Sequence, residues 1–189
     1  MPGLLHTRNF RLWFICFIFS VSILLLILFL GTKGIYLQIG FPPGGIHSYQ
    51  IKCLLIILIL ISSVYLIQHL FHNLIMTTIA TINNCFIFSA ILIIYVLHLG
   101  DVDYTTFSSP KNQENFVVVE RGFGELYQMS KTGLFMKYLA NVHTDDGYRP
   151  FSEGAYQLNW KEPNTLVIRH AFDYMSPNSY TQIVTLKYN

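Results

Sequence analysis

Two long stretches of the chain contain no charged side chain, and they limit what the chain can fold into. They cover residues 12–32 and 53–100. The first twenty residues of the earlier stretch, as a helix, measure about 30 Å, which is the thickness of a bilayer's hydrocarbon core. The later stretch has 48 residues, enough for two such helices and a turn. We therefore predict a transmembrane domain over residues 1–100. Its three predicted transmembrane helices cover residues 12–31, 53–71 and 79–99.

The connections between these predicted helices differ in character. Between the second and third, the break follows a set of polar residues: Gln68, His69, His72, Asn73, Thr77 and Thr78. Between the first and second, residues 41–45 are Phe-Pro-Pro-Gly-Gly, which ends a helix and permits a sharp turn. We expect this longer loop to be a simple connector, with Tyr36 and Tyr49 anchored at the membrane edges.

The first predicted helix is expected to be retained rather than cleaved. Its apolar run is longer than the ~7–15 residues of a signal peptide's hydrophobic region, and residues 31–33 offer no small-x-small cleavage site. Arg8 and Arg11 precede this helix, whereas Lys33 follows it. Because the more basic flank usually stays in the cytoplasm, we expect a multi-pass cell-membrane protein with its N-terminus inside and its C-terminal segment outside.

Beyond residue 115 the sequence pattern changes to short β-rich runs. Residues 101–115 are polar and form a predicted linker, and the runs after it are separated by turns such as Asp145-Asp146-Gly147. In the last three runs, apolar side chains alternate with polar ones and share one face. These are Tyr156, Leu158 and Trp160, then Leu166, Ile168 and Phe172, then Val184, Leu186 and Tyr188. The predicted fold class is therefore membrane α + β, with an antiparallel β meander or sandwich over residues 116–189.

Metal and cofactor chemistry finds little support in the sequence. His69 and His72 are three residues apart, but a third ligand is missing and metal sites usually have three or four. Asp145, Asp146 and Glu153 lack the spacing of a calcium loop, so we expect a turn there. We expect no metal and no cofactor. A net charge of +2 gives no reason to expect nucleic-acid binding either.

Residues of catalytic type are present, but no motif joins them. The carboxylates Glu120, Glu125, Glu153 and Asp173 show no acid–base pairing, and neither His143 nor His170 accompanies a nucleophile motif. None of the three predicted helices contains Asp, Glu, Lys or Arg, which argues against an ion-coupled transporter. The cysteines Cys16, Cys53 and Cys85 are expected to be inert packing residues.

Two adjacent amides stand out inside the third predicted helix. Asn83 and Asn84 are costly in lipid unless they bond to a neighbouring helix, in a contact of about 0.6–2 kcal/mol. We expect them to pack helices together, within the chain or with a partner.

Residues 141–160, Asn-Val-His-Thr-Asp-Asp-Gly-Tyr-Arg-Pro-Phe-Ser-Glu-Gly-Ala-Tyr-Gln-Leu-Asn-Trp, are followed by Thr-Leu-Val-Ile-Arg-His-Ala-Phe at 165–172. This block resembles a domain of small, uncharacterised membrane or lipid-anchored proteins of Gram-positive bacteria. The resemblance covers about residues 114–188 and leaves the predicted helices unmatched. It implies a bacterial β domain outside the cell membrane, and it implies no activity or site residues.

The function we expect from the sequence is interaction rather than catalysis. A bilayer-embedded protein would display its β domain to a membrane-protein partner or to itself, as an accessory subunit, an envelope-stress component or an immunity-type factor. Its predicted contact patch is Tyr148, Arg149, Phe151 and Tyr156, because aromatic residues and arginine favour interface hot spots; the alternative is that these are core and turn residues. Another alternative is a membrane enzyme acting on a lipid or cell-wall substrate. A transporter component is less favoured.

Overall fold

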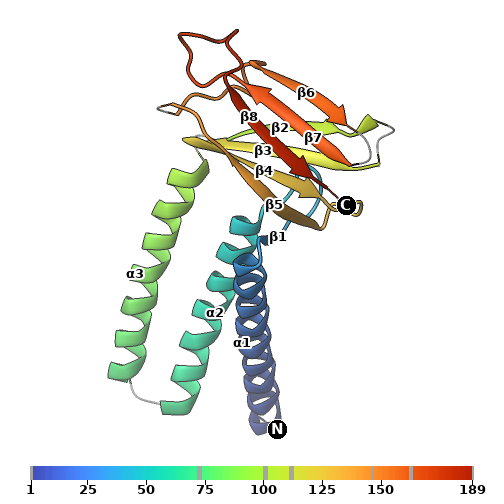
Figure 1. Cartoon of the computed structure of the whole chain (residues 1–189). Coiled ribbons are helices and arrows are strands. Elements are labelled where there is room, and N and C mark those ends of the chain that lie inside the picture. Colours follow the sequence, from blue (N-terminus) through green and yellow to red (C-terminus); the bar gives the residue numbers. More distant parts are fainter. Residues whose placement is uncertain are drawn as a thin grey trace. The chain divides into compact units, whose positions relative to one another are not determined.

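The computed structural model describes residues 2–71, 74–99, 102–110, 113–145, 147–161 and 164–188 (Figure 1). The chain divides into two compact units. The helical unit consists of residues 1–32 and 47–100, and the β unit consists of residues 33–46 and 101–189. Both units are therefore assembled from segments that are separated in the sequence.

The helical unit contains the helices α1 (Pro2–Thr32), α2 (Ser48–Phe71) and α3 (Leu74–Leu99). All three are long and apolar enough to cross a membrane, over Arg8–Thr32, Ser48–Leu70 and Leu74–Ile94. The prediction of three such helices is confirmed. α2 begins five residues before the predicted start because Gln50 caps it: the backbone N–H of His47 donates to Gln50 Oε1 at 2.8 Å.

The predicted break between α2 and α3 is too wide. Gln68 and His69 belong to α2, and Thr77 and Thr78 belong to α3, whereas His72 and Asn73 lie outside the described residues. The Thr78 hydroxyl donates to the carbonyl of Leu74 at 2.8 Å. A threonine whose hydroxyl bonds to the preceding turn adds no unsatisfied polar group to an apolar helix, so it need not end one.

α2 packs against both of its neighbours. On the α1 side, the ring of Trp13 lies 5.5 Å from that of Tyr65, and the ring of Phe10 lies 4.6 Å from that of His69. On the α3 side, the Asn84 side chain contacts α2 through hydrogen bonds. α2 is thus the shared element of the helical unit.

The β unit contains two antiparallel sheets (Figure 1). The larger has the order β1-β5-β4-β3-β2, and the smaller has the order β6-β7-β8. The strands of the larger sheet are β1 (Ile35–Leu37), β2 (Asp103–Ser108), β3 (Asn115–Arg121), β4 (Phe123–Met129) and β5 (Phe135–Val142). Those of the smaller sheet are β6 (Tyr156–Lys161), β7 (Thr165–His170) and β8 (Gln182–Lys187). An antiparallel β domain is therefore confirmed.

The core of the β unit contains apolar side chains from both sheets. Its fully buried members include Phe116, Val118, Leu126, Leu166 and Ile168. Alternation along β6 and β8 directs one face of each strand to this core, as predicted, and the core gains the rings of Trp160 and Tyr188. Phe172 departs from the prediction because β7 ends at His170, which leaves the Phe172 side chain 37% exposed.

The predicted linker is partly wrong, because β2 lies inside it. β2 pairs with β3 along its whole length, from Asp103 opposite Glu120 to Ser108 opposite Asn115. The ring of Phe107 stacks on that of Phe116 at 5.8 Å, which ties the strand to the core. Tyr104 packs against the buried residues on the other face of the sheet, and the polar composition of the segment gives no sign of either contact.

The loop between α1 and α2 is not a simple connector, because it supplies β1. Tyr36 lies opposite Met136 of β5, and the backbone N–H of Tyr138 donates to the carbonyl of Gly34 at 2.8 Å. The ring of Tyr36 meets that of Tyr127 edge-on, with centroids 5.5 Å apart. In this structure Tyr36 is thus a sheet residue, and its predicted role as a membrane anchor is replaced by packing.

The adjacent glycines Gly44 and Gly45 of this loop differ in the space around them, which allows a matched test of the loop structure. A Cβ on Gly45 would lie 2.8 Å from the carbonyl oxygen of Ile39, whereas one on Gly44 would meet nothing within 4 Å. We expect Gly45→Ala to destabilise the β unit by about 1–3 kcal/mol through overpacking, and Gly44→Ala to have little effect. Thermal unfolding of the full chain in detergent measures both, and equal effects would contradict the structure of the loop.

Candidate functional site

The predicted contact patch is mostly interior. Tyr148 is 6% exposed and Phe151 is 2% exposed, and the ring of Phe151 stacks on that of Tyr156 at 4.7 Å. Arg149 Nη1 donates to Asp103 Oδ2 at 2.8 Å, which links the segment to β2. The prediction of a contact patch is therefore corrected. These residues belong to the core and to turns, which is the alternative given above.

Glu120 holds this segment to β3. Its side chain is buried, and its two carboxylate oxygens accept hydrogen bonds from the backbone N–H groups of Phe151 at 3.0 Å and Ser152 at 2.8 Å. Burial raises the pKa of Glu120, while these hydrogen bonds act in the opposite direction. With both oxygens occupied by backbone donors, the carboxylate anchors a turn and is not poised for acid–base catalysis.

His170 is the other buried titratable group of this region. Its Nδ1 lies 3.0 Å from the carbonyl oxygen of Ala171, and its ring lies 6.0 Å from that of Phe151. Burial lowers the pKa of His170, and the charge of His143 lowers it further. His170 is therefore neutral near pH 7, and its packing resembles that of a core residue.

The remaining residues of catalytic or ligand type are not brought together. Glu125 accepts a hydrogen bond from the Tyr127 hydroxyl, and Asp173 accepts one from the backbone of Ser176. Glu153 and His143 are exposed. Asp146 lies outside the described residues. Among the residues that the structure describes, no three His, Cys, Asp or Glu side chains are grouped as metal ligands would be.

Four exposed apolar side chains lie on neighbouring segments of the β unit. The backbone N–H of Asp145 donates to the carbonyl of Phe172 at 2.9 Å, and a Cβ on Gly147 would lie 3.8 Å from the carbonyl oxygen of Gly122. These contacts join the β3–β4 turn, the turn around residue 147 and the β7–β8 loop. We call the exposed side chains of this region the apolar end; they are Phe123 (66% exposed), Phe172 (37%), Tyr174 (67%) and Met175 (80%).

The apolar end is absent from the sequence-based predictions, because Tyr174 and Met175 lie in the β7–β8 loop without a periodic pattern and Phe172 is predicted to face the core. No protein family, curated protein or solved structure matches this chain. Function must therefore be inferred from the surfaces and polar groups of the chain itself.

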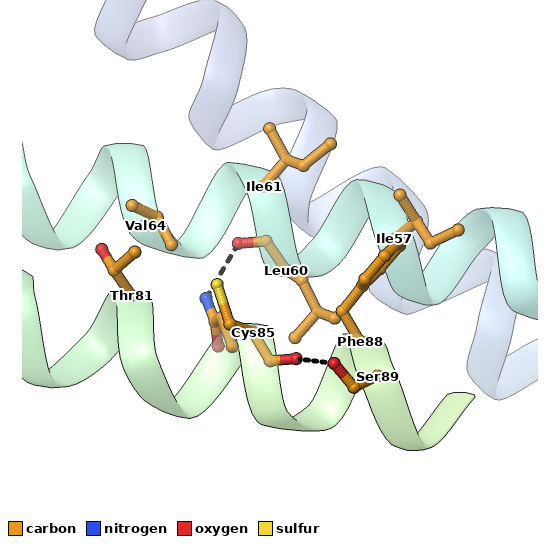
Figure 2. A pocket seen from close by; sticks show the side chains of 9 residues that line it. Ile57, Leu60, Ile61, Val64, Thr81, Cys85, Phe88 and Ser89 are labelled. Carbon is orange, nitrogen blue, oxygen red and sulfur yellow. Dashed lines mark hydrogen bonds between the residues drawn. The ribbon is translucent and has the colours of Figure 1, made fainter. Parts of the chain in front are cut away.

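A second feature is an apolar groove between α2 and α3 (Figure 2), and Asn84 is one of the residues that line it. Asn84 Nδ2 donates to the carbonyl of Leu60 at 3.1 Å and to Ser63 Oγ at 2.9 Å. The groove has a volume of about 310 Å³. It is lined by Ile57, Leu60, Ile61 and Val64 of α2 and by Thr81, Asn84, Cys85, Phe88 and Ser89 of α3.

Asn83, the neighbour of Asn84, is placed differently. Successive residues of an α-helix point about 100° apart, so the two amides cannot face the same helix. Asn83 is exposed, and within the described part of the chain no hydrogen bond reaches its side chain.

Replacing Asn84 tests its contact with α2. We expect Asn84→Leu to weaken the packing of α2 and α3 by about 0.6–2 kcal/mol, because two interhelical hydrogen bonds are lost. Ile82→Leu, at a side chain 65% exposed on the same helix, is the matched control and should have no effect. Unfolding of the full chain in mixed micelles provides the measurement, and an unchanged midpoint for Asn84→Leu would count against the contact.

The lowered pKa of His170 predicts how the stability of the folded chain depends on pH. Because its pKa is lower in the folded chain than the ordinary value of about 6.5, the unfolded chain binds the proton more readily. The stability present above pH 6.5 is therefore lost as the pH falls through that value towards the lowered pKa. We expect the thermal midpoint of the wild type to fall between pH 7.5 and 5, and that of His170→Gln to fall less.

The exposed His143 provides the control for this experiment. His143→Gln should keep most of the pH dependence of the wild type, because it leaves the buried imidazole in place. Glu120 titrates in all three proteins, so its opposite contribution cancels when they are compared at the same pH. Parallel profiles for the wild type and His170→Gln would contradict the assignment.

Proposed function

We propose that this chain is a multi-pass bacterial membrane protein that presents its β unit outside the cell for binding to a protein partner. An accessory subunit, an envelope-stress component and an immunity-type factor are roles of this kind. The observation that carries the proposal is the apolar end. Its four large side chains are each exposed, although burying an aromatic ring would remove roughly 150–250 Å² from water.

The charges around the apolar end favour a protein over a lipid surface as its partner. Burial raises the pKa of the nearby Tyr148, and the carboxylates of Glu153, Asp173 and Glu120 raise it further, so three acidic groups lie near this end of the β unit. Bacterial and other anionic bilayers attract basic surfaces and repel acidic ones. A protein with an apolar pocket and a basic rim fits both features.

The topology of the β unit supports its placement on one side of the membrane. β1 comes before α2, and the other strands come after α3, yet β1 pairs with β5 in the same sheet. If α2 and α3 both cross the bilayer, they return the chain to the side on which β1 lies. With the N-terminus in the cytoplasm, that side is the outside.

Cross-linking from the apolar end tests the proposal. We expect a photoreactive residue at position 174 of the full chain, in native membranes, to form an adduct with one protein. The same residue at position 157, an exposed site on β6, should form none. Tyr174→Ser combined with Met175→Ser should weaken binding of the captured protein by at least about 30-fold, as expected for the loss of hot-spot residues.

The matched control is Leu134→Ser, which removes a side chain 43% exposed beside β5, at the other end of the sheet. It should leave the adduct at position 174 unchanged. Adducts with lipid at position 174, or equal adducts at positions 174 and 157, would contradict the proposal. Loss of activity in an exposed-residue variant such as Glu153→Ala, with the fold intact, would favour a membrane enzyme instead.

A further inference from the structure

Asn83 occupies the costliest position that a polar side chain can have in α3. The span Leu74–Ile94 has 21 residues, and Asn83 lies next to its middle. The most apolar part of this span has no residue buried inside the described chain. An amide that faces hydrocarbon without a hydrogen-bond partner is unfavourable, whereas one that bonds across a helix interface is stabilising.

The face of α3 that carries Asn83 is otherwise small or apolar. Met76, Ala80, Asn83, Ile87 and Ala90 follow one another at intervals of four, three, four and three residues, so they share one stripe of the helix. We call this stripe the seam, because small residues beside a polar one allow close packing against a second helix. The stripe lies about 100° around the helix from Asn84, so α2 does not occupy its centre.

We propose that α3 pairs with α3 of a second copy of this chain, with Asn83 of each copy bonded to Asn83 of the other. A carboxamide has both a donor and an acceptor, so two of them satisfy each other without any other group. Copies of one chain insert in the same orientation, which brings the two amides to the same depth of the bilayer. A two-fold axis through the seam therefore satisfies both side chains at once.

This pairing requires that α3 spans the bilayer, but it does not require the β unit to bind anything. Failure of the cross-linking at the apolar end therefore leaves the pairing intact, and failure of the pairing leaves the apolar end intact. A different membrane protein seated on the seam is the competing occupant, and it would not depend on the concentration of this chain.

Energy transfer between donor- and acceptor-labelled full chains in lipid vesicles measures the pairing. We expect wild-type transfer to fall when the vesicles are diluted with lipid, as for a reversible dimer. Asn83→Leu should raise the dissociation constant about 5–30-fold, the equivalent of about 1–2 kcal/mol. Asn83→Gln keeps the amide and should stay close to the wild type. Ile82→Leu, at a side chain 65% exposed on the opposite face of α3 from Ile87, should have no effect.

Disulfide formation locates the seam independently. In a chain with Cys16, Cys53 and Cys85 replaced by Ala, Ile87→Cys should form an intermolecular disulfide, and Ile82→Cys, on the opposite face, should not. A chain that stays monomeric in vesicles, wild-type transfer for Asn83→Leu, or cross-linking at position 82 in preference to 87 would each overturn the proposal.

Discussion

The pairing of β1 with β5 is the constraint on which the rest of this chain depends. A three-residue strand placed before α2 completes a sheet whose other members all follow α3. Backbone hydrogen bonds do not form across a bilayer, so the segments on either side of the α2–α3 hairpin must share one aqueous face wherever these helices are inserted. Folding of the β unit and insertion of the hairpin are thereby coupled, and a hairpin that failed to cross twice would leave the sheet without its edge strand.

The helices and most of the strands follow from the sequence because their signals are local. The charge-free stretches predict the helices, and the alternation of apolar and polar side chains predicts β6 to β8. β1 has no such signal: three residues establish no period, and its strand conformation depends on β5, some hundred residues further on. β2 is hidden for the same reason, since Tyr104 and Phe107 stand in a polar segment and pack on residues of later strands. A strand whose conformation depends on pairing with another strand, rather than on its own residue pattern, is not predicted from the sequence.

The candidate sites show the same division between local and distant information. Aromatic residues beside an arginine are typical of both interfaces and cores, and only the position of Phe151 against Tyr156 and His170 decides for the core. The exposed Tyr174 and Met175 belong to a loop with no period at all. Asn83 and Asn84 are chemically identical neighbours, and the direction in which each points from the helix separates an internal contact from an open one.

The apolar end and the face of α3 that carries Asn83 depart in opposite ways from the usual match between a protein surface and its solvent. Polar surfaces are stable in water and apolar surfaces are stable in hydrocarbon, and most of this chain follows that pattern. At the apolar end, large apolar side chains face water; on α3, an amide lies within an apolar span without a partner. Each exception costs free energy in the isolated chain, and each cost is removed when a matching surface covers it. Because the apolar end calls for an apolar pocket and the amide calls for another amide, one partner surface does not satisfy both. The two sites therefore point to two separate associations.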